Sequence, residues 1–299
     1  MNFILKKMMS GSKEKGLFGK PDLIIVDDTV VPCPDELTLT EAIPYKEIPG
    51  GQLMAEIVCP KNAEGKLPIA VNVHGGALLF GDHTMERTHR FELAKLGYLV
   101  YNIDYRHLDK ADAFEELDDI CAGLAFAAQT AEKYGGDTDR IYVMGESAGA
   151  FLALYATAAA NSQRVRRAYG CTDPGVNVKA LVCVSGMLYV STSFAVGFAY
   201  KKDLYGERRR DKIFMRYTDP EFSEIMNALP PVFLTTSKGD FLGASTKKYV
   251  KALRKAGHSY RYMYFDSDEL KHGFPFLMPM LPQSKEVLRE IDKWIKKME

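Results

Sequence analysis

Short apolar segments alternate with longer amphipathic ones through most of this 299-residue chain, and that alternation limits the fold more than any other feature of the sequence. Segments that are apolar almost throughout are predicted to be buried strands, at residues 67–73, 98–103, 141–144, 180–185, 232–236 and 260–265. Segments with apolar side chains at three- and four-residue steps are predicted to be helices, at residues 85–95, 114–134, 148–160, 244–256 and 285–297. Apolar strands joined by helices form parallel sheets that are covered on both faces. The sequence therefore predicts an α/β fold with a mostly parallel central sheet, helices on both faces and an antiparallel edge strand at residues 53–58.

Residues 187–229 interrupt this alternation with a segment rich in aromatic and charged residues. The segment lies between two predicted strands, so we expect an insertion that sits over the sheet and does not fold alone. Residues 1–299 are therefore predicted to form a single domain. The aromatic side chains of the insertion either line a substrate pocket or pack the insertion itself, and both interpretations stay open.

A serine flanked by small residues lies where a predicted strand meets a predicted helix, in Gly145-Glu146-Ser147-Ala148-Gly149. A serine in this context resembles the nucleophile elbow of α/β-hydrolases. A tight, strained turn makes the hydroxyl project from the sheet, and the small neighbours let strand and helix approach closely. Ser147 is therefore the candidate nucleophile.

A second glycine motif, His74-Gly75-Gly76-Ala77, directly follows a predicted strand. Glycines let backbone N–H groups approach a substrate oxygen without obstruction by side chains. Upstream of a nucleophile elbow, such a loop supplies donors that stabilise the charge of a tetrahedral intermediate. The N–H groups of Gly75, Gly76 and Ala148 are predicted to form this oxyanion hole.

A serine hydroxyl is a weak nucleophile until a base takes its proton, and histidine is the expected base. In α/β-hydrolases the triad runs along the chain as Ser, acid, His, and only His258 and His272 follow Ser147. His258 precedes the strand predicted at residues 260–265, whereas His272 follows it, at the edge of the sheet where sites form. His272 is therefore the predicted base.

The acid of the triad is expected in the loop after the preceding strand, which ends near residue 236. Asp240 lies in that loop and is predicted to accept a hydrogen bond from the Nδ1–H of His272. Asp266 and Asp268 are nearer to His272 in sequence and compete for this role. Their loop is the histidine's own, so Asp240 is preferred.

Taken together, H-G-G-A at 74–77, D-Y-R at 104–106, G-E-S-A-G at 145–149, G-D at 239–240 and H-G-F at 272–274 resemble the hormone-sensitive-lipase-related esterases of the α/β-hydrolase superfamily. The resemblance covers residues 66–299. It implies carboxylesterase activity on short acyl esters, no metal or other cofactor, and a helical cap made of residues 1–45 and 187–229.

The chain departs from that family's pattern at two positions. Ala77 replaces the third glycine of the usual H-G-G-G, and alanine costs about 1 kcal/mol if that position needs a positive φ. Glu146 stands where the family often has aspartate. Neither change removes a catalytic atom.

Composition limits which binding partners and which cellular location are expected. Lys+Arg and Asp+Glu are both 39, so net charge gives no argument for nucleic acid as a partner. No apolar stretch approaches the ~20 residues of an integral membrane segment, and the run at residues 3–5 is too short for a secretory signal. The five cysteines are odd in number and lack a C-x-x-C spacing, which predicts reduced thiols and a cytoplasmic location. A small-molecule ester is the expected partner, and the oligomeric state, including a homo-oligomer, is left open.

Two other functions fit the same residues. An amidase, formamidase or peptidase would use the same triad, because the pocket chooses the leaving group. A ligand-binding relative that has kept the fold without catalysis is the alternative of another class, although here all three triad residue types are present.

Overall fold

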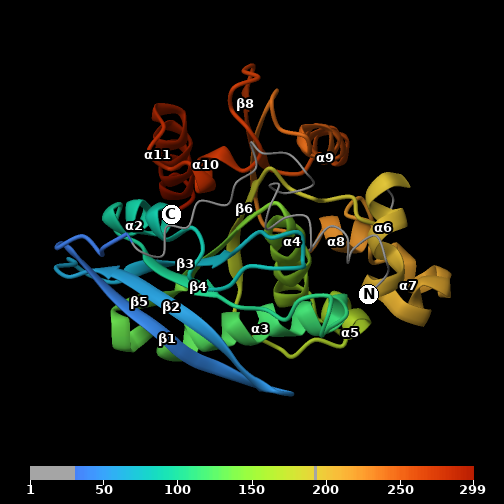
Figure 1. The fold of residues 1–299 in the computed structure, drawn as a ribbon, viewed down its shortest axis with the longest axis horizontal. Coiled ribbons are helices and arrows are strands. Elements are labelled where there is room, and N and C mark those ends of the chain that lie inside the picture. Colours follow the sequence, from blue (N-terminus) through green and yellow to red (C-terminus); the bar gives the residue numbers. More distant parts are fainter. Residues whose placement is uncertain (1–30, 192–193) are drawn as a thin grey trace.

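The computed structural model describes residues 31–191 and 194–299, which form a layered α/β fold around one eight-stranded sheet (Figure 1). The strand order is β1-β2-β4-β3-β5-β6-β7-β8, and β1 and β2 are antiparallel to their neighbours whereas the other strands run parallel. The predicted mostly parallel sheet is therefore confirmed. The strands are β1 (Leu37–Ile48), β2 (Gly51–Pro60), β3 (Leu67–Val73), β4 (Leu99–Ile103), β5 (Gly136–Glu146), β6 (Val178–Val184), β7 (Val232–Ser237) and β8 (Tyr260–Phe265).

Helices cover both faces of the sheet. Successive strand residues point to opposite sides, so one strand contributes apolar side chains to the core on each face. Ile141 and Val143 of β5 pack into one apolar cluster together with α3, α4 and α9, whereas Tyr142 and Met144 pack into a second cluster with α2 and α11. The longer helices are α2 (Arg87–Lys95), α3 (Ala113–Thr130), α4 (Ala148–Asn161), α6 (Phe194–Tyr205), α9 (Gly243–Ala256) and α11 (Pro282–Lys296). Shorter ones are α5 (Gln163–Tyr169), α7 (Lys212–Arg216), α8 (Ser223–Met226), α10 (Phe274–Leu277), and the 3-10 turns Ala131–Tyr134 and Gly206–Arg210.

The amino-terminal part of the predicted cap is partly wrong. Residues 37–45 belong to β1, the edge strand of the sheet, and the antiparallel strand predicted at residues 53–58 lies inside that edge as β2. Pro49 and Gly50 form the two-residue turn between β1 and β2, with Gly50 at φ 88°. A Pro-Gly pair is typical of a β-turn with glycine at a positive φ, and it is a sequence signal from which β1 could have been predicted. The rest of the predicted amino-terminal cap, residues 1–30, lies outside the described residues.

The insertion at residues 187–229 contains α6, α7 and α8 and packs beside α3, α4 and α5 (Figure 1). Two buried tyrosines of the core hold it through backbone carbonyls. The hydroxyl of Tyr155 donates to the carbonyl of Thr218 at 2.6 Å, and that of Tyr169 donates to the carbonyl of Tyr217 at 2.7 Å. Aromatic rings of α3, α4 and the insertion leave a cavity of only about 10 Å³ between them, about the room for one water molecule. In this region the aromatic side chains therefore pack the insertion.

Two further findings bear on the predictions from composition. Over the described ranges, no helix combines the length and the apolar character needed to cross a bilayer. All five cysteines are free thiols, with Cys121 and Cys183 buried.

Candidate active site

Ser147 lies on a sharp turn between β5 and α4 at the carboxyl edge of the sheet. Its backbone is at φ 55°, ψ −114°, a strained conformation that side-chain-bearing residues rarely adopt. Two hydrogen bonds of about normal length hold the turn, from Ser147 N–H to the carbonyl of Val184 (2.9 Å) and from Met187 N–H to the carbonyl of Ser147 (2.9 Å). The strained turn is the geometry that the G-x-S-x-G motif predicts.

The flanking glycines are required by the closeness of the backbone around this turn. A Cβ on Gly145 would lie 2.5 Å from the carbonyl carbon of Gly149, so strand and helix meet without room for a side chain. A Cβ on Gly149 would lie 2.0 Å from the carbonyl oxygen of Val73, at the end of β3. The helix that begins after Ser147 therefore rests directly on the strand that leads into the His74 loop.

We expect Gly149→Ala to destabilise the protein by about 1–3 kcal/mol, because the methyl group overpacks a contact that only backbone movement can relieve. The free energy of unfolding in urea measures this. Gly51→Ala is the matched control, since a Cβ there meets nothing within 4 Å. An equal effect of the two substitutions would contradict the steric argument.

The loops that carry Asp240 and His272 are joined to each other. Gly239 forms an isolated parallel bridge with Lys271, so the residues that follow them, Asp240 and His272, lie side by side. Nδ1 of His272 is 2.7 Å from Oδ1 of Asp240. Asp240 also accepts from the backbone N–H of Leu242 (2.9 Å) and from the Thr236 hydroxyl (2.5 Å), which fixes the direction of the carboxylate.

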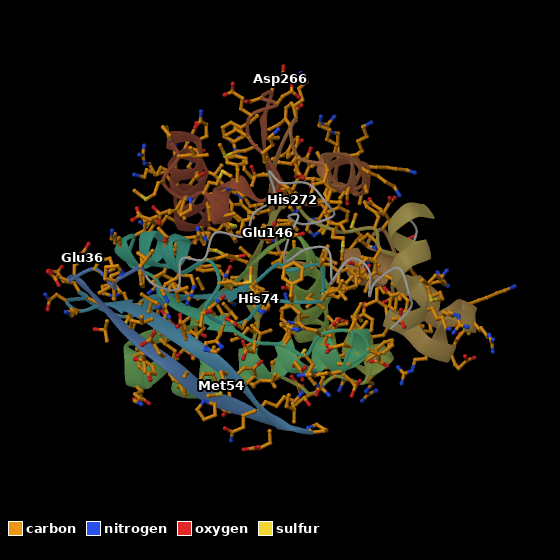
Figure 2. All side chains as sticks on the ribbon, in the orientation of Figure 1. Glu36, Met54, His74, Glu146, Asp266 and His272 are labelled. Atoms are coloured by element: carbon orange, nitrogen blue, oxygen red, sulfur yellow. The ribbon has the colours of Figure 1, made fainter. Side chains whose placement is uncertain are left out.

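Glu146, the residue before Ser147, meets the other nitrogen of the histidine ring. Its Oε1 lies 3.1 Å from Nε2 of His272, and both side chains are only 3% exposed. The two atoms are in ion-pair range without the alignment of a hydrogen bond, and Nε2 has no hydrogen-bond partner in the described part of the chain. Figure 2 shows His272 and Glu146 together near the centre of the molecule. Sequence reasoning named Glu146 only as a mild departure from the family pattern and missed this contact.

The charges around His272 decide its protonation. Burial alone lowers the pKa of the ring, but the contacts with Asp240 and Glu146 outweigh burial and raise the pKa to about 9. Burial raises the pKa of Asp240 in turn, yet its hydrogen bonds, above all with His272, hold the pKa below its usual value. A carboxylate and an imidazolium are thus favoured as a buried pair.

The other residues considered for the base and the acid, His258, Asp266 and Asp268, lie away from this pair. His258 bridges the carbonyls of Leu229 and Ser259, between α9 and β8. Asp268 forms a surface ion pair with Lys238 at 2.7 Å, and Figure 2 places Asp266 at an outer tip of the molecule, well away from His272. Of the candidates weighed from the sequence, Asp240 and His272 are the ones that the structure brings together.

The glycine loop between β3 and α2 has the unusual backbone that its sequence suggests. Gly76 is at φ 107°, and a Cβ there would lie 1.9 Å from the carbonyl oxygen of Phe80. Ala77 is at φ 56°, so the position where the family has a third glycine does need a positive φ. The hydroxyl of Tyr200, from α6, donates to the Ala77 carbonyl at 3.0 Å and holds the loop in place.

The three predicted oxyanion donors differ in what their N–H groups meet. The N–H of Gly75 lies near the buried carboxyl of Glu86. The N–H groups of Gly76, Ala77 and Ala148 donate to no backbone carbonyl among the described residues. Ala77 is thus an additional candidate donor that the sequence prediction did not include.

His74 and the D-Y-R motif at residues 104–106 hold this loop through packing and hydrogen bonds. The hydroxyl of Tyr105 donates to the carbonyls of His74 (3.0 Å) and Gly75 (2.9 Å), and its ring stacks on the imidazole of His74. Burial lowers the pKa of His74 to about 4, so the ring is neutral at pH 7 and serves as packing. Arg106 binds Asp119 of α3 through two of its nitrogens, which anchors the strand end that carries Tyr105.

Within residues 31–191 and 194–299, no group of three or more His, Cys, Asp or Glu side chains is arranged to hold a metal ion.

Comparison with known proteins places these features in a family. The BD-FAE family model matches residues 55–240, which include the glycine loop, Ser147 and Asp240. Among curated proteins, the chain is 26% identical to the isoprenylcysteine alpha-carbonyl methylesterase ICME of Arabidopsis thaliana, over 72% of this chain and 52% of that protein. It is 27% identical to the versiconal hemiacetal acetate esterase of Dothistroma septosporum, over 75% of this chain and 71% of that protein. The chain therefore spans only about half the length of the first of these relatives.

Solved structures share the fold over the whole chain. Esterase B from Lactobacillus rhamnosis, inhibited by a tributyrin phosphonate, aligns with a TM-score of 0.86 at 21% identity, covering 99% of this chain and 95% of that one. A hyperthermophilic esterase from Pyrobaculum calidifontis aligns with a TM-score of 0.70 at 23% identity, covering 99% and 96%. The α/β-hydrolase fold predicted from the sequence is confirmed.

Proposed function

The chain belongs to the BD-FAE family, and we propose that it is a serine carboxylesterase that hydrolyses short-chain acyl esters. The observation that carries the proposal is the strained turn at Ser147, because the preceding residue, Glu146, lies 3.1 Å from the ring of His272, which forms a buried pair with Asp240 at 2.7 Å. The relatives support an ester as the substrate, since two of them are named as a methylesterase and an acetate esterase.

In the proposed reaction, Ser147 Oγ attacks the ester carbonyl while Nε2 of His272 accepts the hydroxyl proton. Asp240 holds Nδ1–H and stabilises the imidazolium. The carbonyl oxygen, now carrying negative charge, is bound by the N–H groups of Gly75, Gly76 and Ala148, with that of Ala77 as an additional candidate donor. The imidazolium then protonates the leaving alcohol, and water activated by His272 hydrolyses the acyl-enzyme.

The proposal of a small acyl group draws on the tight packing along α4, the helix that follows Ser147. Phe151, one helical turn after Ser147 on α4, lines the cavity of about 10 Å³ beside Phe114 and Tyr205. A long acyl chain directed there would have to displace these rings. The proposal also keeps the cytoplasmic location inferred from the sequence, which the five free thiols support.

A p-nitrophenyl ester series of increasing acyl length tests the substrate class. We expect kcat/KM to be highest for acetyl and butyryl esters and to fall steeply for octanoyl and longer chains. Formyl-amide and aminoacyl-amide substrates measured beside them distinguish an esterase from an amidase or peptidase. Faster turnover of the amides, or a preference for long chains, would contradict the proposal.

A further inference from the structure

Glu146 occupies a position that the proposed reaction does not use. Its side chain is buried beside Ser147, and Oε1 lies 3.1 Å from His272 Nε2, the nitrogen that must accept the serine proton. That oxygen has no hydrogen-bond partner in the described residues. A buried carboxylate oxygen without a hydrogen-bond partner is unfavourable unless a nearby positive charge compensates it.

Glycines in two other loops leave the room for this carboxylate. A Cβ on Gly75 would lie 2.0 Å from Oε2 of Glu146, and a Cβ on Gly273 would lie 2.5 Å from Oε1. Gly273 follows His272 directly, and its N–H donates to the Ser185 hydroxyl at 3.0 Å, which fixes the histidine loop over the carboxylate. The contact is thus built by three segments of the chain.

A further buried acid lies behind Glu146. Burial and then the charge of Glu146 raise the pKa of Glu86 to about 8, so Glu86 is a neutral acid at pH 7. Glu86 accepts from the amide of Asn72 at 2.8 Å, and Arg90 of α2 lies near it. The ionisable groups that face His272 are therefore Asp240 and Glu146 directly, with Glu86, Arg90 and the Tyr105 hydroxyl behind Glu146.

We propose that Glu146 is a positioning residue that holds His272 through Nε2 as an ion pair and sets the pH above which the ring can accept the proton of Ser147. This inference rests on the proposed function. Two carboxylates, one at each ring nitrogen, stabilise the imidazolium, so the ring becomes a free base only when the pH exceeds its raised pKa. The imidazolium that forms during attack gains the same stabilisation.

The test is the rate of Ser147 labelling by a fluorophosphonate, measured from pH 5 to 10 in the whole protein. In this reaction Ser147 Oγ displaces fluoride from phosphorus and His272 takes the proton, so the rate follows the base form of His272. In Glu146→Gln we expect the acid limb of the rate–pH profile to shift to lower pH by about one unit or more. A neighbouring charge at this distance shifts the pKa of a group such as His272 by about 1–3 units. The rate on the plateau should fall, because the imidazolium loses one partner.

Two more variants make the result specific. Glu146→Asp keeps the charge one methylene farther away, so its limb should lie between those of the wild type and Glu146→Gln, and it serves if the glutamine variant does not fold. Glu92→Gln removes a carboxylate that pairs with Lys95 on the surface of α2 and should leave the limb in place.

The outcomes separate this inference from the proposed function. Labelling of the wild type with an unmoved limb in both Glu146 variants would overturn the role of Glu146 and leave the esterase proposal standing. A wild type that is not labelled at any pH would overturn both. A role in packing alone would lower stability without moving the limb.

Discussion

Replacing Ser147 with alanine is expected to remove ester hydrolysis almost completely, lowering kcat by about 10⁶-fold. The loss is large because no other group in the site can take over as nucleophile at the strained turn. The fold should survive, since the contacts of Ser147 that hold the turn are made by its backbone N–H and carbonyl. Turnover of p-nitrophenyl acetate and an unchanged thermal unfolding midpoint measure the two effects.

Ser162→Ala is the control for this experiment. Ser162 caps the short helix α5, away from the carboxyl edge, and its hydroxyl contacts only the N–H of Val165 there. We expect wild-type turnover from this variant. Turnover of Ser147→Ala close to that of the wild type would show that another residue is the nucleophile.

Much of the fold could be predicted because apolar strands leave a plain sequence pattern. Strands β3, β4, β6 and β7 lie within a few residues of the predicted segments, since they are almost wholly buried and their sequences are mainly apolar. Strand β5 extends five residues before its predicted start, through a polar stretch, and β8 keeps its predicted bounds although it is only partly buried. Strand β1 was missed because it is a mostly exposed edge strand, and its apolar residues alternate with polar ones instead of forming a continuous apolar run. The Pro49-Gly50 turn was its clearest signal.

The site could be predicted in part, for a related reason. Asp240 and His272 could be predicted because each lies in the loop after a recognisable strand, in the chain order expected of a triad. The contact between Glu146 and His272 depends on the direction of a side chain and on the space left by Gly75 and Gly273, which no local pattern encodes.

Replacing Asp240 with asparagine is expected to lower kcat by about 10⁴-fold while leaving the shape of the site intact. The carboxylate accepts a hydrogen bond from Nδ1–H, so the ring proton stays on Nδ1 and Nε2 is free to act as base. An amide that donates to Nδ1 would place the ring proton on Nε2, where the Glu146 carboxylate, 3.1 Å away, stabilises that wrong tautomer. Hydrolysis of p-nitrophenyl acetate across pH measures the loss, and Asp268→Asn, which alters only a surface pair with Lys238, should retain full activity. If Asp268→Asn fell as far as Asp240→Asn, or if Asp240→Asn retained wild-type turnover, the geometry at Nδ1 would not be that of a catalytic acid.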